Sequence, residues 1–230
     1  MKTITSDEVW PHGWVALLDP GAPIAIGYDP ATTTKGRSNP SAISVVQKLG
    51  VDYYARAVIR FKTGEPKVAR AIIASGLAAM GARNLRPRRL CVAATNERFF
   101  ATDLRTHFAS EVPVELVIES ERTSYLGEAM NFKTYLGNLL VNALEDGHCV
   151  LPNESWLRKD WRSVKREGGG FVYELDEDGN HADTWVATAL ALHGLGGAGG
   201  SAKAAGMPTG TFGSPRVQRQ GIRNPYAHLF

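Results

Sequence analysis

The chain contains few cysteines, and their small number limits the classes of protein to which it can belong. Only Cys91 and Cys149 occur among the 230 residues. They match no zinc-binding spacing, and two thiols do not make the disulfide framework of a small secreted domain. We therefore expect both side chains to be reduced and buried, as in a cytosolic protein.

Membrane and nucleotide-binding signals are also absent. No apolar run reaches the roughly 18 residues of a membrane span, and the N-terminus lacks the basic-then-apolar layout of a signal peptide. The segment Thr33-Thr34-Lys35-Gly36 lacks the glycine spacing of a phosphate loop. We expect a soluble, intracellular protein that does not hydrolyse ATP and has no membrane partner.

Length and composition allow a single domain with a substantial core. The chain is 43% hydrophobic, carries a net charge of +3 and has a pI of about 8.9. A basic balance of this size permits a polyanionic partner without requiring one.

Strand-like and helical segments follow one another in an informative order. Strand-like segments rich in β-branched and aromatic residues occupy 24–29, 42–47 and 51–61. Helical and strand-like patterns then alternate as helix 65–80, strand 89–94, helix 96–109 and strand 114–118, followed by helices 131–144, 156–164 and 181–193 with strand 171–175. The alternation predicts parallel pairing. The whole order predicts a ribonuclease H-like α/β fold over 24–194, with a mixed central sheet flanked by helices.

Two aspartates stand where a nuclease fold assembles a metal site from distant parts of the sequence. Asp29 follows five mainly apolar residues, so its side chain would emerge at the end of a buried strand, and Asp183 lies in the first turn of the last helix. Each has a structural alternative, since Asp29 precedes Pro30 as turn aspartates do, and acids often cap helices. Their occurrence in this order favours a site for Mg²⁺ or Mn²⁺, which prefer oxygen ligands.

Three segments carry a more specific signal. They are Thr95-Asn96-Glu97-Arg98-Phe99-Phe100, Met130–Gly137 and Gly179-Asn180-His181-Ala182-Asp183-Thr184. With them, 24–193 resembles the nuclease domain of phage large terminase subunits, in particular the Mu-like branch. The resemblance implies a C-terminal endonuclease domain that cuts concatemeric double-stranded DNA by two-metal hydrolysis. It also implies a packaging ATPase domain, the portal and the small terminase subunit as partners, in the host cytoplasm.

One position departs from the family pattern. The residue three before Asn96 is usually the second metal-binding aspartate, and here it is Ala93. Either the ligand has been lost, naturally or by substitution, or Glu97 supplies the oxygen instead. We favour the loss, because Asn96 and Glu97 also suit the start of a helix. We therefore expect weak or absent cleavage by this chain, with DNA binding retained.

Several basic residues are candidates for DNA contacts. Lys35 and Arg37 follow Asp29 in a polar loop, and a basic run extends over Arg158, Lys159, Arg162, Lys165 and Arg166. The alternative for such a run is a solvated helix face. His181 lies two residues before Asp183, where it would orient a carboxylate or water, or else make a structural hydrogen bond.

The two ends of the chain differ from its middle. Residues 1–23 look like an irregular lead-in, and 195–230 look like a flexible, glycine-rich, basic tail. Two rival interpretations stay open. One is a resolvase or transposase of the same fold, and the other is a non-catalytic DNA-binding or assembly module that works through the tail.

Overall fold

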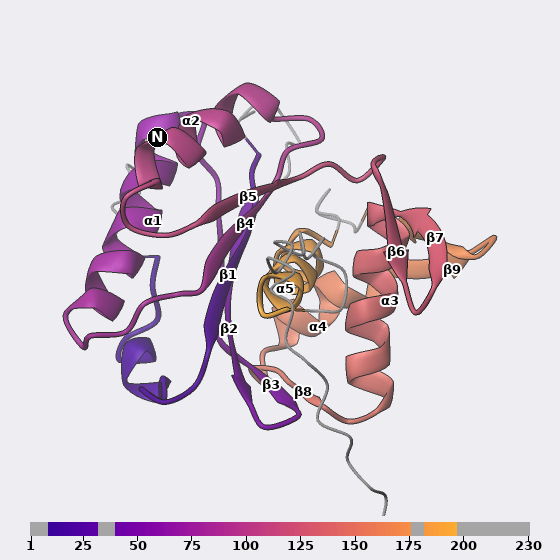
Figure 1. The fold of residues 1–230 in the computed structure, drawn as a ribbon, viewed down its shortest axis with the longest axis horizontal. Helices are drawn as coiled ribbons and strands as arrows, with labels where there is room; N and C mark the ends of the chain where they lie inside the picture. The colour runs from indigo at the N-terminus through magenta and orange to yellow at the C-terminus, as the bar shows by residue number, and fades with distance from the viewer. Residues whose placement is uncertain (1–8, 32–39, 176–181, 197–230) are drawn as a thin grey trace, which may run out of the picture. The chain divides into compact units, whose positions relative to one another are not determined.

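The computed structural model describes residues 9–31, 40–175 and 182–196, all within the first of the two units into which the chain divides, Met1–Gly200. Its centre is a six-stranded sheet in the order β5-β4-β1-β2-β3-β8 (Figure 1). The strands are β1 (Ile24–Asp29), β2 (Ser41–Leu49), β3 (Asp52–Phe61), β4 (Arg89–Ala93), β5 (Val114–Val117) and β8 (Cys149–Val150). β1, β2 and β3 pair antiparallel, whereas β4 pairs parallel with both β1 and β5. The predicted mixed sheet is confirmed.

Helices cover both faces of this sheet (Figure 1). One face carries α1 (Pro66–Gly81) and α2 (Arg98–Phe108), and the other carries α3 (Phe132–Glu145), α4 (Ser155–Arg162) and α5 (Asp183–Gly194). Two small antiparallel sheets lie on the α5 side, formed by β6 (Arg122–Tyr125) with β7 (Glu128–Asn131), and by β9 (Val164–Glu167) with β10 (Gly170–Tyr173). None of the helices within the described residues is both long and apolar enough to span a membrane.

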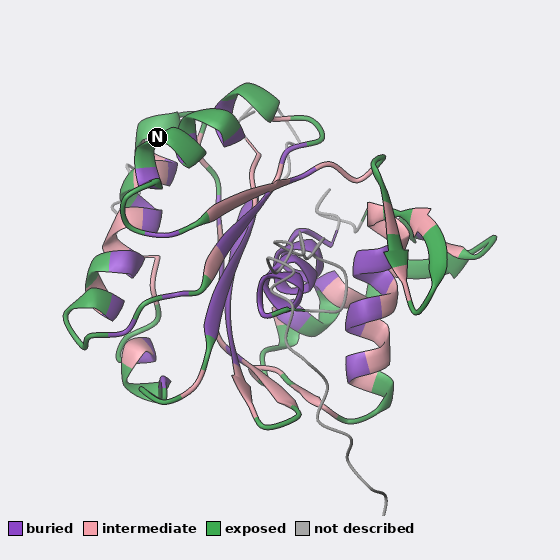
Figure 2. Ribbon diagram, in the orientation of Figure 1, coloured by how far each residue is buried: buried purple, intermediate pink, exposed green. Residues whose placement is uncertain are grey.

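Helix α5 is buried on all sides, because it lies between the sheet and α3 and α4 (Figure 2). Its closest approach is to β1 at Gly27. A Cβ atom there would lie 1.9 Å from the carbonyl oxygen of Ala187 and 2.6 Å from the backbone nitrogen of Ala191. Only a residue without a side chain allows this contact. Gly27 therefore brings the start of α5 close to the end of β1.

The alternation of side chains along the strands decides which residues face α5. In β1, Ala25 packs in the core on the α5 side, whereas Ile24, Ile26 and Tyr28 pack on the α1 side. Asp29 shares the face of Ala25, because residues two apart in a strand point the same way. In β4, Ala93 shares the α5 face with Cys91 by the same rule.

The chain before β1 contributes to the opposite core. A 3-10 helix, η2 (Trp14–Leu17), places Trp14 and Leu18 in the core on the α1 side. The indole of Trp10 stacks on Trp14 at a centroid distance of 4.6 Å and donates a hydrogen bond to the Ile72 carbonyl. Residues 9–23 thus pack against the same helices that cover the sheet.

Some local expectations differ from the structure. Helix α2 begins at Arg98 with Glu97 as its N-cap, and no side-chain cap bond forms, so the expected cap at Asn96 is wrong. Strands β6, β7, β8 and β9 are short and had no clear sequence pattern. Apart from residues 195 and 196, the predicted tail lies outside the described residues, and Leu195 is buried.

Candidate metal-binding and catalytic site

A cavity of about 160 Å³ lies at the carboxyl ends of β1 and β4. Its lining includes Asp29, Ala93, Glu97, Glu119 and Lys133. We call it the carboxylate cavity. The carboxyl ends of adjacent parallel strands meet at one edge of a sheet, which is where ligands bind in many α/β folds.

Asp29 is the last residue of β1 and is partly buried. Burial raises the pKa of its carboxyl group well above the ordinary value, and the negative charges of Asp183, Glu119 and Asp160 raise it further. Acids from three other segments are thus near enough to repel Asp29. Such a group gains more than an isolated carboxylate would from a bound cation.

Asp183 is the first residue of α5, and only 3% of it is exposed. The helix N-terminus is held by α4, because the Asp160 carboxylate accepts hydrogen bonds from the backbone N–H of Thr184, at 3.1 Å, and from its hydroxyl group. Trp161 also donates to the Thr184 hydroxyl at 3.0 Å. These bonds fix the start of α5, and Asp183 lies near enough to Asp29 for its charge to raise the pKa of Asp29.

Ala93 ends β4, next to the end of β1, and lines the carboxylate cavity. The β1–β4 register pairs Tyr28 with Val92, which puts Asp29 and Ala93 at neighbouring positions on one sheet face. An aspartate at position 93 would point into the same cavity as Asp29. The geometry of Ala93 thus matches the place at which the resemblance expects a second metal-binding aspartate.

Glu119 belongs to this group of acids, and sequence reasoning missed it. It lies two residues beyond β5, lines the cavity and contributes to the raised pKa of Asp29. Its backbone N–H donates to the Thr95 hydroxyl at 3.0 Å, and its carbonyl accepts from the backbone N–H of Lys133 at 3.1 Å. Glu119 could have been found from the sequence as an acidic residue that follows a strand predicted to be parallel to β1 and β4.

Glu97 also lines the cavity, but its electrostatic effect is seen on a different group. The pKa of the Tyr28 hydroxyl is raised by burial first, and the charges of Asp29 and Glu97 add to this rise. Glu119, by contrast, is among the acids that raise the pKa of Asp29 itself. Both residues thus line the cavity, and Glu119 is the one whose charge acts on Asp29.

A cation and a phenol complete the lining. Lys133, near the start of α3, lies with its Nζ atom 3.9 Å from the ring centroid of Tyr173. The pKa of Tyr173 is raised mainly by burial, and then by the charges of Glu119 and Asp29. Lys133 was not singled out from the sequence, because one lysine at a helix start carries no distinctive pattern.

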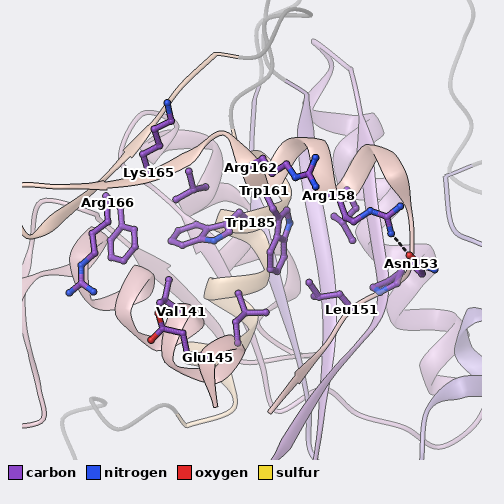
Figure 3. A pocket seen from close by; sticks show the side chains of 15 residues that line it. Val141, Glu145, Leu151, Asn153, Arg158, Trp161, Arg162, Lys165, Arg166 and Trp185 are labelled. Atoms are coloured by element: carbon purple, nitrogen blue, oxygen red, sulfur yellow. Dashed lines mark hydrogen bonds between the residues drawn. The ribbon is translucent and has the colours of Figure 1, made fainter. Parts of the chain in front are cut away.

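The predicted DNA-contacting residues fall into two groups. Lys35, Arg37 and His181 lie outside the described residues. The run from Arg158 to Arg166 is exposed but is divided between α4 and β9. Four of its five members, Arg158, Arg162, Lys165 and Arg166, border a separate groove rather than the carboxylate cavity (Figure 3).

A second group of potential ligands has a structural explanation. Ligand atoms of Cys91, Glu115 and His193 lie within 4.8 Å of one another. His193 bonds to Glu115 through Nε2 at 2.9 Å and to the Tyr135 hydroxyl through Nδ1 at 3.0 Å. Arg89 bonds to Glu115 at 2.6 Å, and burial raises the pKa of the Cys91 thiol, which disfavours a thiolate ligand. This group joins α5 to β4 and β5.

Comparisons with known proteins agree with the architecture. No protein-family model matches the sequence, and no curated protein matches it. Among solved structures, the large terminase nuclease domain of Thermus phage P74-26 aligns with 75% of this chain and 80% of that one, at 15% identity and a TM-score of 0.50. A mutant of the large terminase subunit of bacteriophage Sf6, in a structure with calcium, aligns with 79% and 92%, at 8% identity and a TM-score of 0.50. At these identities the likeness shows the fold alone, and the fold is ribonuclease H-like.

Proposed function

We propose that this chain is the nuclease domain of a viral DNA-packaging terminase, a divalent-metal-dependent endonuclease that acts on double-stranded DNA. The observation that carries the proposal is the proximity of Asp183, at the start of α5, and of Glu119, beyond the end of β5, to Asp29 at the carboxyl end of β1, in a fold shared with large terminase nuclease domains. The Mu-like branch, a preceding ATPase domain, the portal and small-subunit partners, and a location in the host cytoplasm are parts of the same proposal.

The donor set fits Mg²⁺ or Mn²⁺. Carboxylate oxygens are the ligands that both ions prefer, and the negative charges of the acids around Asp29 add to the rise of its pKa. Asp29, Asp183 and Glu119 would hold the ions. Divalent ions bound there would activate the attacking water and stabilise the leaving oxygen of the phosphodiester.

The other residues of the cavity would position the DNA. Lys133 carries the positive charge in this lining, and its ammonium group would contact a phosphate next to the scissile bond. The rim of Arg158, Arg162, Lys165 and Arg166, with Lys159 beside it, would add sequence-independent phosphate contacts. Lys35, Arg37 and His181 keep the roles expected from the sequence, as duplex contacts and as a residue that orients the site.

Ala93 limits the activity that we expect. Without an aspartate there, three carboxylates remain, and they would hold one ion better than a pair. We therefore expect weak Mn²⁺-dependent nicking of plasmid DNA by this chain and at least about tenfold faster cleavage by Ala93→Asp. In the Ala93→Asp protein, Glu119→Gln should lower cleavage about 100-fold, whereas the matched change Glu97→Gln should have little effect.

Supercoiled plasmid with Mn²⁺, followed on a gel, gives the rates of all four proteins. Loss of cleavage in Glu97→Gln but not in Glu119→Gln would mean that Glu97, rather than Glu119, is the third carboxylate. If Ala93→Asp binds Mn²⁺ by calorimetry but cuts neither linear nor branched DNA, the nuclease proposal is wrong. The second candidate, a DNA-binding module without catalysis, is favoured by Ala93 and would then be the better account.

A further inference from the structure

An apolar groove of about 630 Å³ lies on the α5 side of the sheet, away from the carboxylate cavity (Figure 3). Its walls come from α3, α4, β9, β10 and the start of α5. We call it the tryptophan groove, after Trp161 and Trp185, whose rings lie at its centre in Figure 3. A depression of this volume falls in the range of binding pockets for small molecules and side chains.

The lining of the tryptophan groove is apolar on the inside and basic at the edge. The apolar side chains include Val141, Leu144, Leu151 and Val164, all partly exposed. The edge carries four basic side chains, namely Arg158, Arg162, Lys165 and Arg166, against one acidic side chain, Glu145. Partly exposed apolar walls beside a mainly basic edge are typical of a surface that binds a partner.

The more buried of the two indole rings is poorly placed for stacking nucleic-acid bases. Trp185 is only 3% exposed, and its ring packs against Phe171 and Tyr173 at centroid distances of 5.6 and 5.7 Å. Single-stranded nucleic acid binds through open aromatic faces, whereas these walls are mainly aliphatic. The apolar walls instead suit aliphatic or aromatic anchor side chains, and the edge suits acidic neighbours.

We propose that the tryptophan groove binds an acidic protein segment with aliphatic or aromatic anchor residues, supplied by another protein. Charge complementarity favours such a partner over the C-terminal residues of this chain, because Arg216, Arg219 and Arg223 have the same sign as the edge of the groove. An amphipathic helix that lays its apolar face in a groove is a common form of such recognition.

The position of the groove connects it to the carboxylate cavity. Trp161 donates a hydrogen bond to Thr184, the residue after Asp183, and Trp185 contacts Tyr173, which lines the cavity. A segment bound against these two indoles would restrain the start of α5. The partner would thereby affect the site described above, although binding itself does not depend on the chain's being a nuclease.

The test measures fluorescence anisotropy with three labelled probes. They are an amphipathic helical peptide with leucine and phenylalanine on one face and glutamate on the other, the same peptide with lysine in place of glutamate, and single-stranded oligothymidylate. The full chain should bind the glutamate peptide at least about tenfold more tightly than the lysine peptide, and the glutamate peptide should displace any oligonucleotide that binds at the basic edge of the groove. Equal binding of both peptides, or tighter groove-dependent binding of the oligonucleotide, would overturn the proposal.

Two variants test whether the glutamate peptide binds in the tryptophan groove. Leu151→Ser alters the apolar wall. The double variant Arg158→Gln with Arg162→Gln removes edge charge from exposed positions and should leave the fold intact. Each should weaken binding of the glutamate peptide about tenfold. The matched control, Lys67→Gln with Arg105→Gln, removes equal charge from exposed residues of α1 and α2 and should leave binding unchanged.

Leu151→Ser also separates this proposal from the proposed function. It should weaken the peptide without changing the rate of plasmid cleavage, because Leu151 lines only the groove. Peptide binding that is unaffected by both groove variants would show that the peptide binds elsewhere and would overturn the proposal. A failure of cleavage in every protein would leave the peptide result intact.

Discussion

The two faces of the central sheet are covered in different ways. On one face, α1 and α2 each bury one side and expose the other, as amphipathic surface helices do (Figure 2). On the other face, α5 is buried all round between the sheet and a second layer formed by α3 and α4. Both the carboxylate cavity and the tryptophan groove lie on this second face. The helices α3, α4 and α5 on this face come from distant parts of the sequence, and their packing therefore brings distant side chains together.

The largest effect should follow from a change at the contact that joins this layer to the sheet. In Gly27→Ala, the new methyl group would collide with the backbone of α5 at Ala187 and Ala191. We expect the free energy of unfolding to fall by about 3 kcal/mol, with loss of any cleavage, because Asp183 moves with α5. Chemical denaturation followed by circular dichroism measures the change.

The control for that prediction lies on the α1 face. Gly81→Ala places a methyl group at the end of α1, where no heavy atom lies within 4 Å. Alanine is favoured over glycine in a helix by up to about 1 kcal/mol, so this variant should be as stable as the parent or slightly more stable. Equal destabilisation by both substitutions would show that the contact at Gly27 is not special.

A second test concerns the charge of the carboxylate cavity. Because the pKa of Asp29 is raised in the folded chain, the folded state holds the proton more tightly than the unfolded state. The free energy of unfolding should therefore fall as pH rises from the ordinary aspartate pKa through the raised one. Asp29→Asn should remove this fall and make the metal-free protein more stable at neutral pH.

The same variant should lose its response to metal. Mn²⁺ at about a hundredfold above its Kd should stabilise the parent by roughly 2 to 3 kcal/mol at neutral pH, and less in acid, where Asp29 is protonated. Differential scanning calorimetry with and without Mn²⁺ measures the stabilisation at neutral pH and in acid. A full metal response in Asp29→Asn would mean that the ions bind at another site, while Glu97→Gln serves as the control that keeps the response.

The smallest effect should come from the hydrogen bonds between α4 and α5. Asp160→Ala removes the acceptor for the Thr184 N–H and hydroxyl groups and should cost about 1 to 2 kcal/mol. Asp160→Asn keeps an acceptor but removes a charge that raises the pKa of Asp29. Asparagine should therefore be less destabilising than alanine in thermal melts, and a similar loss in both would assign the effect to charge rather than to capping.

Residues near the site were predictable to different degrees. Asp29 could be located because an apolar run makes a buried strand evident, and Ala93 because the resemblance marks its position. Glu119 and Lys133 could not, since Glu119 follows a short strand and Lys133 lies at the start of a helix, and only the packing of these segments places both in the lining of one cavity. The role of Asp160 as a cap for α5 was hidden for the same reason, because its partner lies 24 residues later.

The sequence by itself determined the order of the longer strands and helices and the mixed pairing of the sheet, because strand and helix periodicity are local properties of the chain, but it did not reveal the short strands β6 to β9. It also pointed to Asp29 and Asp183 as one site. The tertiary structure alone decided which other acids join them and where the basic run lies. Those features depend on strand register, on the close contact at Gly27 and on the packing of α4 against α5, and such long-range contacts leave no periodic signal in the sequence.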